Sequence, residues 1–269
     1  MGAGRIMARI VMLLGLVLIT GNLAASGANA AGQYEGVASC SGSTCHGRNE
    51  GDGKVVRQDE LRMWQEPSSQ GGAHSRAYAT LASPRGQQIA SSLGLGKATA
   101  AGACLGCHAT FAPTGQRGGR FQISDGVGCE SCHGPASNWL SSHYAVPASH
   151  ASNVASGLVP LEKPQARASV CLDCHFGSEK AGQFVTHSMM AAGHPRVTFE
   201  LDLFSSLQQH HNIDKDYTRR KGTPDSVQMW AVGQAEAVAR STRLFANAKL
   251  ANEGVFPEFY FYDCHSCHR

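Results

Sequence analysis

The sequence predicts a mainly α fold with extensive coil, and three observations support this. The clearest periodic segment, residues 225–254, follows a helical pattern, whereas alternating strand patterns are weak throughout the chain. Glycine is frequent, with 31 residues, and aromatic residues make up only 7% of the 269. A chain of this composition buries too little apolar surface of its own to offset the conformational entropy lost on folding. We therefore expect another apolar group to supply part of the core.

The helix predicted at residues 225–254 begins with an acidic cap, Asp225, and ends at Gly254. Its apolar side chains recur at helical spacing and are expected to form the face that packs on the rest of the fold. They are Val227, Trp230, Ala231, Ala235, Val238, Thr242 and Phe245.

Residues 1–30 have the pattern of a secretory signal peptide. Arg5 and Arg9 give a positive start, residues 10–20 are an apolar run, and "ANA" at residues 28–30 is a small-residue cleavage site. The apolar run is short for a spanning helix, which needs about 20 residues. An uncleaved signal that anchors the chain in the membrane is the alternative.

The rest of the chain, residues 31–269, is expected to form one domain with no transmembrane helix. Export by the signal peptide would place this domain in a bacterial periplasm.

All ten cysteines fall in five pairs, and each pair is followed at once by a histidine. Four pairs have the form C-x-x-C-H: Cys104/Cys107 with His108, Cys129/Cys132 with His133, Cys171/Cys174 with His175, and Cys264/Cys267 with His268. C-x-x-C-H is the attachment signature of c-type haem, in which both thiols bond to the porphyrin and the histidine binds iron from the proximal side. One such motif alone could belong to a zinc site, but five ordered pairs favour haem.

The remaining pair, Cys40/Cys45 with His46, has four residues between the thiols. The loop between them would have to bulge, which Gly42 and two serines accommodate. A local disulfide or a vestigial site is the alternative. Because the end of the motif is retained and no other cysteine is available, we predict a fifth haem c here. Five haems would also supply the missing apolar core.

Eight further histidines could bind iron from the distal side: His74, His143, His150, His187, His194, His210, His211 and His265. His187 and His194 are seven residues apart, which on a helix is one face. Pro195 would end that helix, so the two either share a face or diverge toward different haems. His265 lies inside the last motif and cannot bind that motif's own iron, but it could reach a neighbouring haem.

Several segments resemble the cytochrome c-554 family of multihaem c-type cytochromes. They are "MWQEPSSQGGAHSRAYATL", "DGVGCESCHGPASNW", "HSMMAAGHPRVTFEL", "DYTRRKG" with "VQMWAVGQA", and "FPEFYFYDCHSCH". The resemblance implies a periplasmic electron-transfer protein whose chain wraps closely stacked haem pairs. It also implies mainly bis-histidine ligation, sometimes with one five-coordinate haem. Carried onto this chain, it favours as distal ligands His74, His143, His187, His194 and His265.

Two features depart from the family pattern. The first is the spacing at Cys40. The second is the chain end, where one arginine follows His268 although similar proteins continue with further helical sequence. We therefore expect the sequence to be a truncated member of the family.

The charge balance indicates which partners to expect. The formal charge is +3, but ten propionates on five haems would make it negative. The basic residues are thus expected to neutralise propionates and not to bind nucleic acid. Redox partners, either a redox protein or a membrane quinol-linked donor or acceptor, follow from the haem motifs.

Three functions are open to such a chain. The favoured one is an electron carrier, in which protein supplies spacing and ligands while iron does the redox chemistry. The alternative is an oxidoreductase acting on a small inorganic nitrogen or sulfur compound at one open haem, although eight spare histidines and the absence of a C-x-x-C-K motif argue against it. A third is a subunit of an electron-conducting filament.

Overall fold

The computed structural model describes residues 32–50, 57–209, 211 and 213–268. The chain divides into two units, Met1–Gly32 and Gln33–Arg269, and the second contains all ten cysteines. The predicted signal peptide, its cleavage site and the candidate ligand His210 lie outside the described residues. No helix in the described part of the chain is long and apolar enough to cross a membrane.

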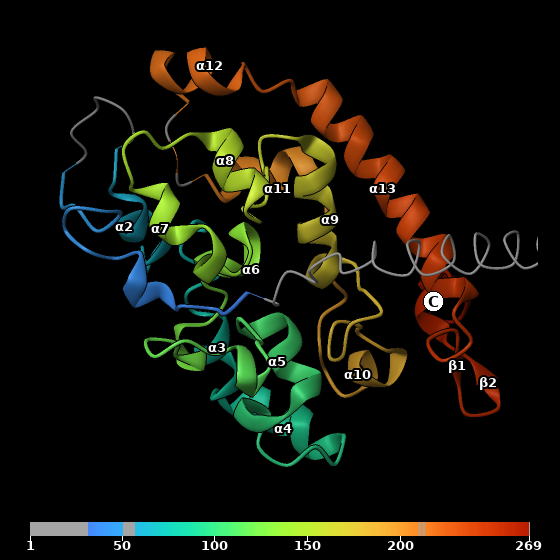
Figure 1. Ribbon diagram of the computed structural model, residues 1–269. Helices are drawn as coiled ribbons and strands as arrows, with labels where there is room; N and C mark the ends of the chain where they lie inside the picture. The colour runs from blue at the N-terminus through green and yellow to red at the C-terminus, as the bar shows by residue number, and fades with distance from the viewer. Residues whose placement is uncertain (1–31, 51–56, 210, 212, 269) are drawn as a thin grey trace, which may run out of the picture. The chain divides into compact units, whose positions relative to one another are not determined.

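Helices and connecting coil make up nearly all of the second unit (Figure 1), which confirms the predicted mainly α fold. The α-helices are α2 (Glu60–Trp64), α3 (Ala77–Leu81), α4 (Pro84–Ser92), α5 (Gly102–His108), α6 (Cys129–His133), α7 (Leu140–His143), α8 (His150–Ala155), α9 (Pro164–His175), α10 (His187–Ala191), α11 (Leu201–Leu207), α12 (Lys215–Lys221) and α13 (Ser226–Ala246).

Short 3-10 helices and one small hairpin complete the described structure. The 3-10 helices are η1 (Val37–Ser39), η2 (Ala98–Ala100), η3 (Thr114–Gln116), η4 (Ile123–Asp125), η5 (Ala136–Asn138), η6 (Phe259–Phe261) and η7 (Cys264–Ser266). The hairpin pairs β1 (Asn252–Glu253) with β2 (Phe256–Pro257) in antiparallel register.

The buried apolar residues form two small clusters, as the composition predicts. One joins α3, α4 and α5 through Leu81, Ala90, Ala98, Cys104, Leu105 and Ala109. The other joins α9, α11 and α13 through Ala168, Leu172, Leu201 and Met229. Figure 1 shows α13 running beside α9, the helix that ends in one of the Cys/His motifs. Protein packing alone therefore ties the long helix to a predicted haem segment.

The predicted apolar face of α13 is wrong. All seven residues named for it are exposed, among them Val227 at 74% and Val238 at 68%. The buried side is instead formed by Met229, Gly233, Arg240 and Leu244. The helix also ends at Ala246, since Gly254 serves in the hairpin turn with φ 64°.

Close approach and charge pairing explain why this other face is buried. A Cβ atom at Gly233 would lie 2.6 Å from the Cβ of Leu201, so only glycine lets α11 come this near. The guanidinium of Arg240 donates to Asp173 at 2.7 Å, to the carbonyl of Gly177 at 2.9 Å and to that of Ser169 at 3.1 Å. A pattern that counts only large apolar side chains misses both residues.

The Arg240–Asp173 pair predicts a large effect of one substitution. Arg240→Met should lower the free energy of unfolding by about 3 kcal/mol, because it leaves a partly buried carboxylate with one partner fewer. Lys180, which also pairs with Asp173, keeps the loss at the lower end of the range for buried pairs. Denaturant unfolding of the haem-loaded protein, followed by circular dichroism, measures the change. Arg243→Met is the matched control on the exposed side of α13 and should change stability by less than about 0.5 kcal/mol. Equal effects of the two substitutions would contradict the role given to Arg240.

Candidate haem sites

None of the ten cysteines forms a disulfide, and they lie in five short segments. We number these Cys/His segments in chain order: first 40–46, second 104–108, third 129–133, fourth 171–175 and fifth 264–268. The second, third and fourth segments are helical turns within α5, α6 and α9. In a helical turn, residues three apart lie on one face. Both thiols of each of these three motifs are thus presented on the same side.

The first segment closes its longer loop with backbone hydrogen bonds. The amide of His46 donates to the carbonyl of Cys40 at 3.1 Å, and the carbonyl of Gly42 accepts from Cys45 at 2.8 Å and from Gly47 at 3.1 Å. The two extra residues are absorbed in this loop, although the Cys45 thiol is exposed. The predicted bulge is therefore present, and the segment still brings Cys40 and His46 together.

Among the four C-x-x-C-H motifs, the fifth segment is the one with an exposed cysteine. Cys264 is half-buried and accepts a hydrogen bond from the Arg196 guanidinium at 2.6 Å, whereas Cys267 is exposed. The physical reason is the short turn: η7 ends at Ser266, before Cys267, whose amide still donates to the carbonyl of Cys264 at 3.2 Å. The turn keeps the two residues close but leaves the Cys267 thiol in solvent. Haem attachment at Cys267 therefore stays a prediction from the motif.

Thiols of different segments lie against each other. Cys40 and Cys129 are hydrogen-bonded, which raises the pKa of the Cys40 thiol and lowers that of Cys129. Cys107 and Cys174 form a second such pair, with the pKa of Cys174 raised and that of Cys107 lowered. The first segment thus adjoins the third, and the second adjoins the fourth.

Burial keeps other thiols protonated. It raises the pKa of Cys132 to about 12 and that of Cys171 to about 11. The charges of Cys171 and Cys174 add to the rise at Cys132, which places the third segment beside the fourth. Such thiols are poor nucleophiles and metal ligands at neutral pH.

Four histidines of the Cys/His segments each lie beside a histidine from elsewhere in the chain. The ring centroids are separated by 6.0 Å in His46–His143, 6.0 Å in His175–His74, 6.2 Å in His108–His194 and 6.3 Å in His268–His187. A metal bound between two imidazoles, at about 2.0–2.1 Å from each nitrogen, would separate the ring centroids by about 6 Å. All four pairs therefore have the spacing that one iron atom with two histidine ligands requires.

Hydrogen bonds to Nδ1 orient several of these rings. Nδ1 of His108 lies 3.0 Å from the carbonyl of Ala77, Nδ1 of His194 lies 2.8 Å from that of Pro195, Nδ1 of His46 lies 2.9 Å from Glu60, and Nδ1 of His143 lies 3.2 Å from the side-chain amide of Asn153. Where the partner is an oxygen, as at His46, His108 and His194, Nδ1 carries the ring proton and Nε2 is left for a metal, as is usual for ligating histidines. The amide nitrogen of Asn153 can only donate, so its contact orients the His143 ring without freeing Nε2.

Burial also favours the neutral form of four of the eight paired rings. It lowers the pKa of His175 to about 4 and lowers the pKa of His74, His108 and His143 from the usual value. Only a neutral imidazole has a lone pair for iron. His46 differs, because its hydrogen bond to Glu60 raises its pKa.

A buried polar atom beside one pair has no protein partner. Nε1 of Trp139 is buried and makes no hydrogen bond among the described residues, and the Trp139 ring packs edge-on against His143 at 5.7 Å. A haem propionate near this pair would give the indole an acceptor. Among all the residues that the structure describes, no group of three or more His, Cys, Asp or Glu is arranged to hold a metal ion, as a zinc site would need. The donor set fits haem.

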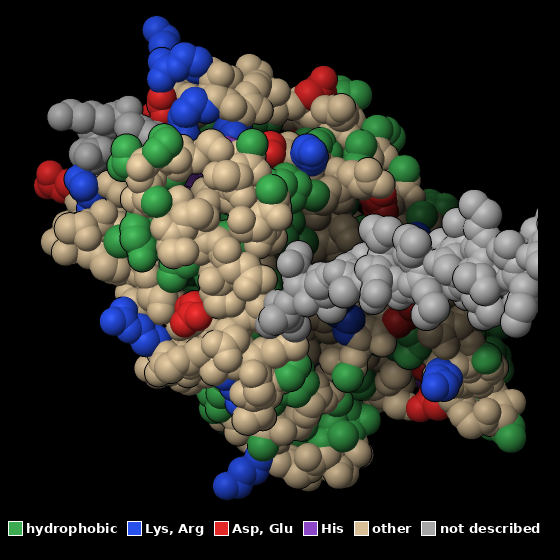
Figure 2. All heavy atoms as spheres, viewed as in Figure 1, with side chains coloured by type: hydrophobic (Ala, Val, Ile, Leu, Met, Phe, Trp, Pro, Cys, Tyr) green, Lys and Arg blue, Asp and Glu red, His purple; other side chains and the backbone are tan. Residues whose placement is uncertain are grey.

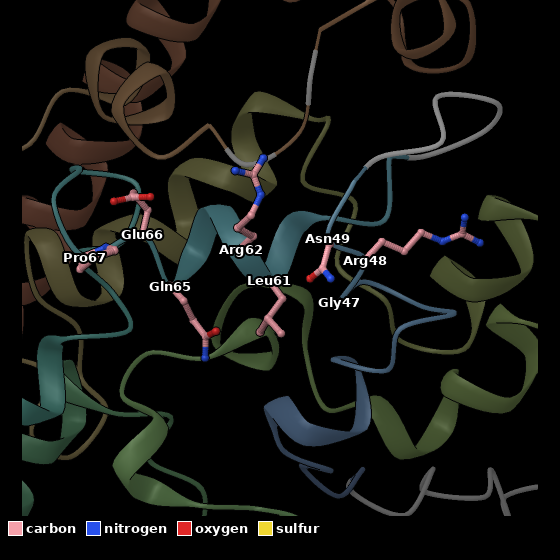
Figure 3. Close-up of a pocket in the computed structure, with 8 residues that line it drawn as sticks. All are labelled: Gly47, Arg48, Asn49, Leu61, Arg62, Gln65, Glu66 and Pro67. Carbon is pink, nitrogen blue, oxygen red and sulfur yellow. The ribbon is translucent and has the colours of Figure 1, made fainter.

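The first segment borders an open groove of about 300 Å³. Figure 3 shows that its side chains do not converge: Arg62 points to one side of α2, Leu61 and Gln65 point to the other, and Arg48 extends away from all three. The groove therefore lacks the convergent polar groups of a substrate pocket. Figure 2 adds that little histidine surface is visible on the face shown.

The distal candidates divide into two groups. His74, His143, His187 and His194 each lie beside a histidine of a Cys/His segment, and His187 and His194 lie beside different ones. The divergence follows from α10, which ends at Ala191, before His194. His265 is exposed in η7 and belongs to none of the four pairs, so its role as a ligand stays a prediction. Its position in the fifth segment turns it to solvent.

Sequence reasoning missed the residues that hold the ligands in place. Glu60 and Asn153 contact His46 and His143 through side chains, yet neither belongs to a recognisable motif. His211, which was only one of eight candidates, contacts Glu60 at 3.3 Å. No local pattern predicts such contacts, because they join residues that are far apart in the chain.

Gly106, inside the second segment, offers a test of how closely the segments must pack. A Cβ atom there would lie 2.4 Å from the carbonyl oxygen of Gly182, a backbone atom that cannot turn aside. Gly106→Ala should lower the free energy of unfolding by about 1–3 kcal/mol, as overpacked sites do. The thermal midpoint of the haem-loaded protein measures this. Gly115→Ala is the control, since nothing lies within 4 Å of a Cβ at that position, and a similar drop in both variants would contradict the prediction.

Comparisons with known proteins support the same chemistry. A family described as cytochrome c554 and c-prime matches residues 40–134, which include the first three Cys/His segments. Comparison with curated proteins and with solved structures found no match. The match confirms the resemblance expected from the sequence, and c-type haem is the cofactor that it implies. Over residues 40–134 the chain is therefore similar to the cytochrome c554 and c-prime family.

Proposed function

We propose that this protein is an exported electron carrier that holds five covalently attached haems, one at each Cys/His segment. The observation that carries the proposal is the set of four histidine pairs with ring centroids 6.0–6.3 Å apart. Two histidines on one iron fill both axial positions, which suits electron transfer and leaves no place for a substrate. Haem supplies the one-electron chemistry when bound; the chain supplies attachment, ligands and spacing.

The pairs suggest which residues serve each haem. His46, His108, His175 and His268 would be the proximal ligands of the first, second, fourth and fifth haems. Their distal ligands would be His143, His194, His74 and His187, in that order. The third haem would be attached at Cys129 and Cys132 with His133 as its proximal ligand.

Contacts between segments support an order of haems in space. The thiol contacts place the first segment next to the third and the second next to the fourth. The charges around Cys132 place the third next to the fourth. The hydroxyl of Tyr260, just before the fifth segment, donates to the carbonyl of Phe176, which follows the fourth, at 2.9 Å. The order of neighbouring haems in space would then be first, third, fourth and second, and the fifth haem would lie beside the fourth.

The site of action and the partners follow from the sequence. Residues 1–30 would direct export to a periplasm, and residues 31–269 would be the haem domain. The donor and acceptor would be redox proteins or a membrane quinol-linked complex. Encounter with them would depend on the surface charge that propionates and basic side chains set together.

The test is to produce the protein with a c-haem maturation system and to measure its mass and its electron paramagnetic resonance spectrum. We expect a mass increase for five haems, and low-spin ferric signals from the four haems with paired histidines that do not change with nitrite or hydroxylamine. A mass increase for fewer haems would overturn the count. A high-spin signal that responds to those molecules would instead favour the oxidoreductase.

Removal of one distal ligand should leave one iron with an empty sixth coordination position. We expect His143→Ala to convert one haem from low-spin to high-spin iron without loss of haem, because the iron between His46 and residue 143 keeps only its proximal ligand. Spin quantitation of the oxidised variant measures the change. His150→Ala is the matched control, since His150 lies close by in sequence but pairs with Glu162 at 2.9 Å. The assigned pair is wrong if the His143→Ala protein stays fully low-spin.

A further inference from the structure

One buried carboxylate contacts two imidazoles at the first Cys/His segment. Glu60 is only 6% exposed and lies in the first turn of α2. Its Oε2 lies 2.9 Å from Nδ1 of His46, and its Oε1 lies 3.3 Å from Nδ1 of His211. The carboxylate is therefore held between two imidazoles and aimed at the back of a predicted iron ligand.

The other described ring contacts of this kind are made to neutral groups. Nδ1 of His108 and of His194 each face a backbone carbonyl, and Nδ1 of His143 faces an amide side chain. Among the described histidines of the four pairs, His46 is thus the one whose Nδ1 bonds to a carboxylate. A charged acceptor makes a shorter and stronger bond than a neutral one and draws the N–H proton further from the ring. The ring then becomes a stronger electron donor at Nε2.

The surroundings hold this contact in place from both sides. The amide of Leu61, the next residue on α2, donates to the carbonyl of His46 at 3.0 Å. The backbone of α2 and the Glu60 side chain therefore both bind His46. At the other end of α2, Nε1 of Trp64 donates to the carbonyl of Val127 at 3.0 Å. Figure 3 shows that Leu61 and Arg62 point in opposite directions from α2. Arg62 is exposed to solvent, whereas the buried Glu60 carboxylate is shielded and its field is weakly screened.

We propose that Glu60 is a positioning residue that lowers the reduction potential of the haem at the first segment by acting through His46. The inference rests on the proposed function, since it requires haem on Cys40 and Cys45. A negative charge and a more basic ligand both stabilise ferric over ferrous iron, and hydrogen bonds behind a ligand are a known means of tuning haem potentials. The first haem would then be the low-potential end of the series and would pass electrons on to the third.

The test compares redox titrations of the wild-type protein and Glu60→Gln. Glutamine keeps the shape and a hydrogen-bond acceptor but removes the charge. We expect one titration step to move upward by about tenfold in its reduction equilibrium, which is about 59 mV for one electron. The step is assigned to the first haem through the low-spin signal that His143→Ala removes. Glu66→Gln is the matched control, because Glu66 is a nearby glutamate that contacts Ser68 and should leave every step unchanged.

A second variant gives a shift of opposite sign. His211→Ala removes the other donor to Glu60, so more of the carboxylate charge acts on His46 and the same step should move downward. A merely structural role for Glu60 does not predict opposite shifts. If Glu60→Gln does not fold or take up haem, the His211→Ala titration alone decides the matter, and an unchanged or raised step overturns the inference.

The mass of each protein shows whether a negative result contradicts the role of Glu60 alone or the proposed function as well. Full haem content with no shift in either variant overturns the role of Glu60 and leaves the proposed function intact. A wild-type protein without haem on Cys40 and Cys45 overturns both the haem proposed at the first segment and the inference.

Discussion

The structure depends on one constraint, the separation of two imidazole rings by about 6 Å at each of four places. Each pair joins a residue of a short local motif to a residue far away in the chain, as His46 is joined to His143. Packing between the chain's own side chains contributes little to stability at these points, because the apolar clusters consist mostly of small side chains and few large ones are fully buried. The helices are correspondingly short. They hold thiols and imidazoles at fixed positions. A haem between each pair of rings would complete the core.

The local part of this arrangement could be predicted from the sequence, and the non-local part could not. Five Cys/His motifs, the mainly α class and four of the histidines that meet them follow from spacing and resemblance. The partner of each ring does not, because nothing in the sequence near His74 specifies His175. The face of α13 was predicted wrongly for a related reason. Its buried side is defined by a glycine and an arginine, which bury well only because Leu201 and Asp173 lie opposite them.

Burial of the thiols shows the same limit of local patterns. The motifs "CLDCH" and "CHSCH" have the same C-x-x-C-H spacing, yet the second cysteine is half-buried in the one, Cys174 in α9, and exposed in the other, Cys267 after η7. The difference lies in what packs on each turn: α9 is covered by α13, and the turn of η7 is held mainly by its own backbone bonds. A motif therefore predicts which atoms can attach haem, while the surrounding helices decide how enclosed that attachment is.

Three buried glutamates show how differently a carboxylate can be used in one fold. Glu130, inside the third segment, accepts from the backbone amides of Glu35, Gly36 and Ala136 at 2.7–2.8 Å. Glu258 accepts from the amides of His187 and Tyr260 at 2.7 and 2.9 Å, so both act as caps that fix backbone next to a Cys/His segment or its partner. Glu60 differs because its donors are imidazoles, and the His46 ring would be bonded to the iron itself and transmit the charge behind it. Burial does not separate structural carboxylates from tuning ones, because all three are buried. The identity of the hydrogen-bond donor separates them. By this reasoning the first segment, which departs most from C-x-x-C-H spacing, is also the one where the fold acts most specifically on the electronic properties of the ligand.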